Sequence, residues 1–472
     1  EKEVRTFAEH NAEAVKEVES MVARRWTQKF SSKSRAKRYA RGRLVMSRLI
    51  VIIKEKLKKD EHGRTYKKLK RRLILNLKSS GVSGASKKHE RVLLPRTLDA
   101  VFEIMEAKRA NPEVVLDFAD ASFQFPVNAD ELKYMVTTAG GAFYVFNRAA
   151  QGSRGAPLIS GRGIALAMRL ATSTAPMSQV RSSTYVDDPL MSFAGLDAEN
   201  DRNITKVILA LRSLNFSLAY EKAQDSKYDG IISWTSARLN IMTDTYGVEV
   251  SLKDEILEDV KDNISNIQAY NRVQLRTVRQ LAGRANCIAS LIHPWRPFVA
   301  MLWAPIYDTR AHCADQPSHM WVKALAVPLR WMKAFLDGTR RTLHRHYALA
   351  DYMGEGPLIE IVMDASTEGL GAYLTIDGTL KEFFFSDLTA EDCAICGHEL
   401  GDSSGQQTWE ALVALVSLRL WHGIWHRKRV NLRVMGDSVT AMALLLRLKA
   451  RGSGPALVAR EIALDMADAL YQ

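Results

Sequence analysis

The chain has 472 residues, of which 47% are hydrophobic and 25% are charged; these ordinary proportions exclude a disordered or fibrous protein. No run of 18 uncharged apolar residues is present, so we expect no membrane span. Four cysteines are too few for a disulfide framework, and no basic-then-apolar leader opens the sequence. We therefore expect an intracellular protein, in the cytoplasm or the nucleus.

The positive charge is concentrated near the amino terminus. Residues 1–100 contain 28 Lys and Arg against 11 Asp and Glu, whereas the other residues contain 38 against 42. Such a basic block indicates a polyanionic partner, most simply nucleic acid. Solvated helix faces are the alternative, but they explain single lysine runs better than an excess over a hundred residues.

In chain order, helix is predicted over residues 5–58, where Gly and Pro are scarce and apolar residues around 15–22 recur at helical spacing. Short β-branched or alternating apolar runs predict strands at 72–77, 114–116, 143–146, 184–186 and 190–193. The spacing of Ile204, Val207, Ile208, Leu211 and Leu214 predicts an amphipathic helix.

Residues 250–340 have mostly helical periodicity, and 351–357 contain two Gly and one Pro that indicate a linker. Beyond it, strands are predicted at 359–363, 372–375, 380–385 and 430–435, around a helix at 408–425. The sequence thus predicts a mixed α/β body, a helical middle and a small carboxyl-terminal α/β domain.

Carboxylates stand at the ends of predicted strands in the body. Asp117 follows an apolar strand, and Asp187 and Asp188 are predicted in the turn of a hairpin. Adjacent like charges are costly unless a cation lies there, and two divalent ions can clamp the oxygens of a phosphoryl transfer. A solvated Asp-Asp turn with an unrelated Asp117 is the alternative.

Four motifs in fixed order settle the interpretation. They are Val115–Pro126, Gln151–Pro157, Tyr185–Asp188, which reads Tyr-Val-Asp-Asp, and Asn215–Lys222. Together they resemble the motifs of reverse transcriptases, and their order and spacing carry more weight than any single one. The resemblance implies that Asp117 and Asp187 bind two Mg²⁺ ions (Mn²⁺ is an alternative), with Asp188 beside them.

The same resemblance implies a nucleotide pocket formed by Arg72, Asp120, Ala121, Ser122, Gln151 and Lys222. Arg72 would bind the triphosphate, and Lys222 would protonate the leaving pyrophosphate. Ser122 departs from the family, which usually has Tyr or Phe there to exclude the ribose 2′-hydroxyl. Ser cannot block that hydroxyl sterically, so the sequence leaves the selection of dNTPs over rNTPs open.

A second carboxylate set lies in the carboxyl-terminal domain. Asp364 ends a predicted strand, Glu410 lies on a predicted helix, and Asp437 ends another strand. This layout suits divalent metal ions and resembles ribonuclease H, in which it matches three of four acidic residues. We expect the fourth beyond Gln472. Cys393 and Cys396 resemble half of a zinc site, but the sequence offers no second pair of ligands.

The resemblances imply an α+β multidomain fold: a right-hand polymerase palm, fingers and thumb, then a ribonuclease H-like α/β domain. The expected regions are a basic helical amino terminus (1–60), fingers and palm (61–235), helical thumb and connection (236–350) and a truncated ribonuclease H-like domain (357–472).

The implied function is that of an RNA-directed DNA polymerase of an LTR-type or tyrosine-recombinase (DIRS-like or gypsy-like) retrotransposon. Its partners would be an RNA template, a DNA primer, their RNA–DNA hybrid and dNTPs. A relic that binds nucleic acid without catalysis and a DNA-templated polymerase with a similar palm are the alternatives.

Overall fold

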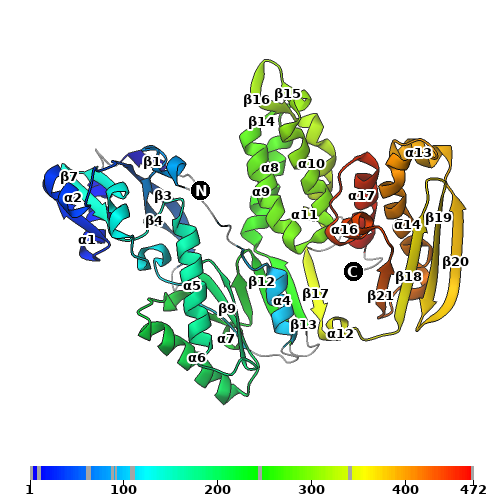
Figure 1. Cartoon of the computed structure of the whole chain (residues 1–472), viewed down its shortest axis with the longest axis horizontal. Helices are drawn as coiled ribbons and strands as arrows, with labels where there is room; N and C mark the ends of the chain where they lie inside the picture. Colours follow the sequence, from blue (N-terminus) through cyan, green and yellow to red (C-terminus); the bar gives the residue numbers. More distant parts are fainter. Residues whose placement is uncertain are drawn as a thin grey trace. The chain divides into compact units, whose positions relative to one another are not determined.

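The computed structural model describes residues 4–7, 12–59, 65–86, 90, 93–106, 112–242, 247–338 and 343–468, the side chains of 4–7, 54–59 and 65–70 excepted. The chain divides into two compact units. The first unit comprises residues 1–95 and 112–225, and the second comprises 96–111 and 226–472. Both mix helices and strands (Figure 1). Within the described residues, none of the helices combines the length and apolar character that a bilayer crossing demands.

Three sheets make up the first unit. Strands β1 (Val4–Phe7), β3 (Arg48–Lys59) and β4 (Thr65–Asn76) form one in the order β1-β3-β4. Strands β2 (Thr27–Phe30), β6 (Val136–Ala139) and β7 (Ala142–Phe146) form another, in the order β2-β7-β6. The third contains β5 (Glu113–Val115), β8 (Val180–Tyr185), β9 (Asp188–Phe193) and β10 (Gln224–Asp225), in the order β10-β5-β9-β8.

Helices α5 (Ala156–Thr172) and α6 (Asp197–Ser213) pack on each other, and α5 also packs on β8 of the third sheet. The core between them buries Ile164 and Met168 of α5 against Met191 and Phe193 of β9. This layer fixes the end of the β8–β9 hairpin. The remaining helices of the unit are α1 (Ala12–Ala23), α2 (Lys33–Tyr39) and the single turn α3 (Val82–Ala85).

The expected basic helical amino terminus is wrong for much of its length. The helical spacing correctly predicted α1, but residues 49–53 are Leu-Ile-Val-Ile-Ile, and such β-branched side chains pack well on a pleated strand. Leu49 and Val51 of β3 are buried at strand spacing, as are Leu73 and Leu75 of β4. A scarcity of Gly and Pro is compatible with strand as well as helix, so it could not separate the two.

The second unit opens with α4 (Thr97–Glu106) and α7 (Ser226–Asp229). A four-stranded antiparallel sheet follows in the order β11-β12-β13-β17; its strands are β11 (Ile231–Trp234), β12 (Ala237–Met242), β13 (Gly247–Leu252) and β17 (His344–Ala348). The sequence analysis did not predict this sheet, and residues 236–350 are therefore not purely helical. The alternation of Val248, Val250 and Leu252 in β13 is a strand signal, but the helical periodicity of the residues that follow outweighed it.

The predicted helices of residues 250–340 are present. They are α8 (Asp254–Gln268), α9 (Leu275–Leu291), α10 (Arg296–Tyr307) and α11 (Ala326–Leu336). A small sheet in the order β14-β16-β15 accompanies them, formed by β14 (Arg272–Gln274), β15 (His312–Cys313) and β16 (Gln316–Trp321). The buried faces include Val260 and Ile264 of α8 and Val278 and Leu281 of α9, which confirms the predicted helical periodicity.

After α12 (Leu349–Tyr352), a sheet forms in the order β20-β19-β18-β21 from β18 (Leu358–Ala365), β19 (Gly369–Ile376), β20 (Thr379–Asp387) and β21 (Asn431–Met435). β18 pairs antiparallel with β19 and parallel with β21. The helices here are α13 (Ala390–Cys396), α14 (Gln406–Leu420), α15 (His422–Trp425), α16 (Val439–Arg447) and α17 (Ser453–Ala467). α14 packs on β18 and β19 (Figure 1), so the four predicted strands and the helix between them are confirmed.

Candidate active site

The ends of three strands place the first carboxylate set. The β5 backbone continues past its last paired residue, because Leu116 N donates to Pro189 O at 3.1 Å and Phe118 N to Asp187 O at 3.3 Å. On the other side, Ala219 N donates to Asp117 O at 2.8 Å. The residue between these contacts, Asp117, therefore lies beside the β8–β9 hairpin.

The hairpin turn differs from the predicted one by one residue. Tyr185 pairs with Asp188, so the turn consists of Val186 and Asp187, and Asp188 is the first residue of β9. Val186 has φ +57°, in the left-handed region where a β-branched residue is strained by about 1–3 kcal/mol. Such strain is typical of functional turns, because the surrounding sheet must hold it in place.

Burial and charge act on Asp187. Burial raises the pKa of its carboxyl and the charge of Asp117 raises it further, whereas Lys222 and Arg72 act in the opposite direction. The Nζ of Lys222 donates to Asp117 Oδ1 at 2.7 Å. Partial burial lowers the pKa of Lys222, but the hydrogen bond to Asp117 and the negative charges of Asp117, Glu221 and Asp188 together outweigh it, and the pKa is raised. The set is thus two neighbouring carboxylates with one ammonium.

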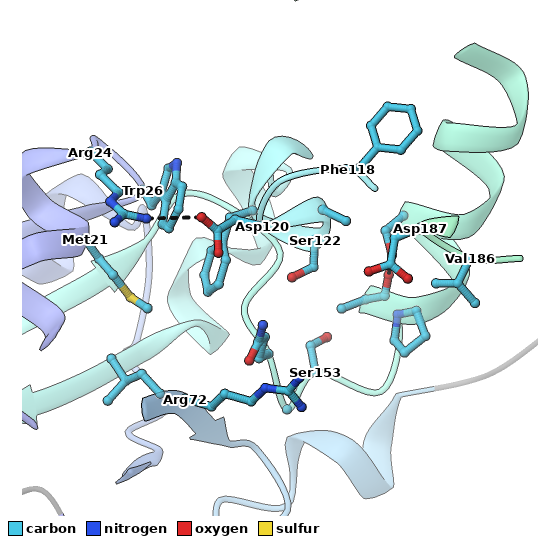
Figure 2. A pocket seen from close by; sticks show the side chains of 18 of the residues that line it. Met21, Arg24, Trp26, Arg72, Phe118, Asp120, Ser122, Ser153, Val186 and Asp187 are labelled. Carbon is cyan, nitrogen blue, oxygen red and sulfur yellow. Dashed lines mark hydrogen bonds and ion pairs between the residues drawn. The ribbon is translucent and has the colours of Figure 1, made fainter. Parts of the chain in front are cut away.

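A cavity of about 690 Å³ opens in front of these residues (Figure 2). Ser122, Ser153 and Asp187 point into it, and the side chain of Arg72 extends along its floor in this view (Figure 2). Eight of the predicted site residues line this cavity: Arg72, Asp117, Asp120, Ala121, Ser122, Gln151, Asp187 and Lys222. Asp188 is not among the lining residues.

Gln151 reaches the cavity because its neighbour is glycine. Leu75 N donates to Gln151 O at 2.9 Å, which holds this segment against β4. Gly152 has φ +102°, and a Cβ there would lie 2.4 Å from Leu75 O. Only glycine fits such a close approach at this φ. Arg72 is on β4, like Leu75. Gln151 and Arg72 are consequently held on the same wall of the cavity.

The sequence analysis missed the contribution of α1. The cavity is lined by Glu17, Ser20 and Met21 of α1 and by Arg24, which directly follows this helix. Arg24 Nη1 forms an ion pair with Asp120 Oδ2 at 3.1 Å (Figure 2). The polar residues of α1 resemble any solvated helix face, so the sequence contained no signal that this helix would line the cavity.

Beside that ion pair, an aromatic stack forms part of the wall. The guanidinium of Arg24 lies 4.9 Å from the ring centroid of Trp26. Trp26 stacks on Phe123 with centroids 4.7 Å apart and planes 6° apart. Phe123 follows Ser122 in a 3-10 turn, so the stack fixes the turn that presents Ser122.

The second carboxylate set lies at one edge of the β20-β19-β18-β21 sheet. β18 and β21 are parallel, so Asp364 near the end of β18 and Asp437 just after β21 meet at the same edge, and α14 brings Glu410. Donor atoms of the three lie within 4.8 Å of one another. In the described part of the chain, this is the one group of three potential ligands that could hold a metal ion.

The chemistry of this second set fits a hard divalent cation. Glu410 is 5% exposed; burial raises its pKa, and the charges of Asp437 and Asp364 add to the rise. Gln406 Nε2 donates to Glu410 Oε1 at 3.0 Å, but Oε2 is buried without a hydrogen-bond partner. Oxygen ligands with an unpaired buried lone pair are what Mg²⁺ or Mn²⁺ requires. The first set offers carboxylate oxygens too, and its ammonium shows that a cation is stabilised there.

Asp465 does not join the second set. It accepts hydrogen bonds from Arg419 Nε at 2.8 Å and Arg419 Nη2 at 2.9 Å, and its side chain is 8% exposed. Cys393 and Cys396 are both buried on α13, and no described group of metal ligands includes them.

No protein-family model matches this sequence, and no curated protein matches it either. Solved structures are similar. The foamy viral protease–reverse transcriptase dRH in complex with double-stranded DNA is 14% identical with a TM-score of 0.50, over 96% of this chain and 67% of that one. The foamy viral protease–reverse transcriptase with double-stranded DNA has 12% identity and a TM-score of 0.46, over 92% and 75%. The foamy viral protease–reverse transcriptase in complex with an RNA/DNA hybrid has 13% identity and a TM-score of 0.45, over 95% of this chain and 52% of that chain. The mixed α+β fold of this chain is therefore similar to that of reverse transcriptases.

Proposed function

We propose that the chain is an RNA-directed DNA polymerase of a retroelement, which extends a DNA primer on an RNA template with dNTPs. One observation carries the proposal: eight of the site residues that the reverse transcriptase resemblance implies, spread from Arg72 to Lys222, line one cavity. A chance set of motifs would have no reason to meet in space. The similarity of the fold to reverse transcriptases supports the same conclusion.

The regions of the chain follow from this proposal. Residues 61–235 would form the fingers and palm, 236–350 the thumb and connection, and 357–472 a ribonuclease H-like domain. The sheet β10-β5-β9-β8 with α5 and α6 would be the palm, since it presents Asp117 and Asp187. The basic residues of 1–100 would neutralise template and primer phosphates without reading sequence.

In the proposed reaction, the primer 3′-hydroxyl oxygen forms a bond to the α-phosphorus of a dNTP. The bond from that phosphorus to the β-phosphate breaks, pyrophosphate leaves, and the hydroxyl proton passes to solvent. Asp117 and Asp187 would hold Mg²⁺ or Mn²⁺, which when bound neutralises the developing negative charge.

The chain's own residues position the nucleotide. Arg72 forms no ion pair with any described carboxylate, so its guanidinium remains available to the triphosphate. Gln151 and the backbone of 120–121 would contact the sugar and base. Lys222, whose raised pKa keeps it protonated at neutral pH, would supply a proton to the leaving pyrophosphate.

Asp364, Glu410 and Asp437 would form a second site that hydrolyses the RNA strand of the RNA–DNA hybrid. Two observations support this site. The ligand atoms of the three carboxylates lie within 4.8 Å of one another, and Glu410 Oε2 is buried without a hydrogen-bond partner. Parallel strand ends and one buried helix residue hold the carboxylates where divalent ions would bind.

Primer extension on an RNA template with Mg²⁺ and dNTPs tests the polymerase proposal. We expect extension by the wild-type chain and a loss of at least about 10²–10³-fold in Asp187→Asn. Asp262→Asn, an exposed carboxylate on α8, is the matched control and is expected to extend normally.

Lack of extension by the wild-type chain, with salt-sensitive binding of the hybrid retained, would overturn the polymerase proposal and support a nucleic-acid-binding relic. Extension on DNA templates alone would instead support the DNA-templated alternative. Extension by Asp187→Asn at the wild-type rate would remove the proposed role of that carboxylate.

A further inference from the structure

A second cavity, of about 570 Å³, lies within the second unit. Its walls come from α4, from β17 and α12, and from the segment 425–432 that leads into β21. The apolar and aromatic side chains in the lining are Leu98, Val101, Phe102, Met105, Tyr347, Ala348, Tyr352, Trp425, Val430 and Leu432. None of the residues assigned to polymerase or nuclease chemistry takes part.

The rim of this cavity is strongly basic. Arg345, Arg427, Lys428 and Arg429 all line it, and the one acidic lining residue is Asp351. Asp351 Oδ1 accepts a hydrogen bond from Arg429 Nε at 2.9 Å. In the described part of the chain, the other three cations have no carboxylate partner, so the rim carries uncompensated positive charge.

Arg345 lies among other cationic side chains. Its guanidinium lies 5.0 Å from the centroid of the Tyr347 ring, and its Nη1 lies 3.5 Å from His293 Nδ1. Burial, helped by the charges of Arg296, Arg345 and Arg96, lowers the pKa of His293 to about 3. The three arginines make the surroundings of His293 positive, so an anion would be stabilised beside Arg345.

Two aromatic rings are open to solvent at the cavity. Phe102 and Tyr352 are 41% and 40% exposed, with centroids 6.0 Å apart and planes inclined at 37°. Such rings offer a face on which a flat heterocycle can stack. Two buried donors, Trp425 Nε1 and Tyr347 Oη, have no hydrogen-bond partner among the described residues.

The cavity is remote from the second carboxylate set. Asp364 lies near the carboxyl end of β18, whereas Val430 and Asn431 stand at the amino end of the parallel strand β21. Leu358 of β18 pairs with Asn431, and Asp364 lies six residues further along this extended strand, so about 20 Å separate the two edges of the sheet. The cavity is therefore a separate site.

We propose that this cavity binds a nucleoside monophosphate unit, either as a free mononucleotide or as the 5′-phosphorylated end of a nucleic acid strand. The base lies against Phe102 and Tyr352, and the phosphate lies against Arg345, Arg427 and Lys428. A nucleotide matches this lining, because its phosphate carries the negative charge that the basic residues attract and its flat base can stack on the exposed rings. This proposal is independent of the polymerase activity.

Calorimetric titration of the full-length chain, in EDTA and without primer or template, tests it. The probes are AMP, the 5′-phosphorylated dinucleotide pdApdA and unphosphorylated dApdA. We expect the double variant Arg427→Glu/Lys428→Glu to weaken AMP binding at least about tenfold, because two charge-assisted contacts are lost. Phe102→Ala is expected to weaken it about fivefold or more through lost stacking.

Matched controls separate this site from general electrostatics and from the first cavity. Lys323→Glu/Lys381→Glu changes the net charge equally at exposed positions outside the lining, and Arg72→Ala alters the first cavity. Both are expected to bind AMP as the wild type does. Thermal unfolding curves verify that each variant is folded.

Tight binding of AMP but not pdApdA identifies the free mononucleotide as the source, and tighter binding of pdApdA than of both AMP and dApdA identifies the strand end. Either outcome supports the proposal. It is overturned if neither probe binds, if the control double variant loses affinity equally, or if inorganic phosphate competes as well as AMP while Phe102→Ala has no effect.

Discussion

Lys222 Nζ lies 2.7 Å from Asp117 Oδ1, and the two residues are 105 positions apart in the chain. Asp117 follows β5, whereas Lys222 belongs to a 3-10 turn after α6. The ammonium is 51% exposed, so the ion pair contributes only about 1 kcal/mol or less to folding. Its greater effect is local: it reduces the repulsion between Asp117 and Asp187.

Replacement of this ammonium is expected to strengthen metal binding at the first carboxylate set. Lys222→Met removes a positive charge that repels a divalent ion, so Mn²⁺ affinity without nucleotide should rise about two- to fivefold. Electron paramagnetic resonance titration of Mn²⁺ measures this, in an Asp437→Asn background that weakens the second set. Lys206→Met on α6 is the control. Unchanged or weaker Mn²⁺ binding by Lys222→Met would contradict the arrangement.

Ser122 is expected to control selection of the sugar. Its small side chain faces the cavity and leaves space beside a bound ribose. Ser122→Tyr should therefore reduce insertion of ATP relative to dATP by about 10–200-fold, through steric exclusion of the 2′-hydroxyl. Single-nucleotide insertion kinetics with both substrates test this. An unchanged ratio in a variant that still inserts dATP would show that another residue selects the sugar.

Replacement of Gly152 by alanine is expected to reduce stability and primer extension, whereas the same replacement of Gly84 is not. Gly152→Ala would place its Cβ 2.4 Å from Leu75 O at φ +102°, which should destabilise the first unit by about 1–3 kcal/mol and move Gln151. Gly84→Ala is the matched control, since no atom lies within 4 Å of its added Cβ. Urea unfolding and primer extension measure both effects. Equal behaviour of the two variants would contradict the role of the Gly152 contact.

Glu410 is expected to make the second unit less stable as the pH rises. Its pKa is raised above the usual 4.5, so the folded state binds more protons than the unfolded state between those two values. The unfolding free energy therefore falls as the pH rises through that window. In EDTA at pH 7.5, Glu410→Gln should raise the melting temperature by roughly 2–4 °C.

Differential scanning calorimetry at pH 5 and pH 7.5 tests this dependence. The gain from Glu410→Gln should shrink at pH 5, and added Mg²⁺ should stabilise the wild type more than the variant. Glu391→Gln, exposed on α13, should show none of these effects. A lower melting temperature for Glu410→Gln at pH 7.5 in EDTA would contradict the prediction.

The carboxylates that were predicted from sequence share one property: each lies in, or directly after, a clear local element. Asp117 and Asp364 follow apolar strands, and the residues around Glu410 have helical periodicity. Tyr185–Asp188 was predicted as strand, turn and strand, but the sequence did not show which residue would adopt positive φ. Valine at the turn violates the usual preference for Gly or Asn, so propensity pointed one residue away.

The parts that were missed depend on contacts between distant segments. Nothing local connects Arg24 with Asp120, which lies 96 positions later. The strands β11 to β13 were not predicted, although β12 and β13 alternate apolar and polar residues at strand spacing. The prediction of helix over β3 failed for a local reason, since its β-branched run was visible and outweighed by the absence of Gly and Pro.

The placement of α4 has a consequence for biosynthesis. Its residues 97–106 belong to the second unit, although the chain returns to the first unit from 112 to 225. Ala100, Val101, Ile104 and Met105 are buried, and the helix packs on β13 and α9. A ribosome that adds 5–20 residues per second completes those partners on the order of 10–40 s after α4. During that interval the apolar face of α4 has no β13 or α9 to pack against, so it is exposed and accessible to chaperones. For the same reason the first unit cannot be excised as one continuous piece, because a linker from residue 95 to residue 112 must replace α4.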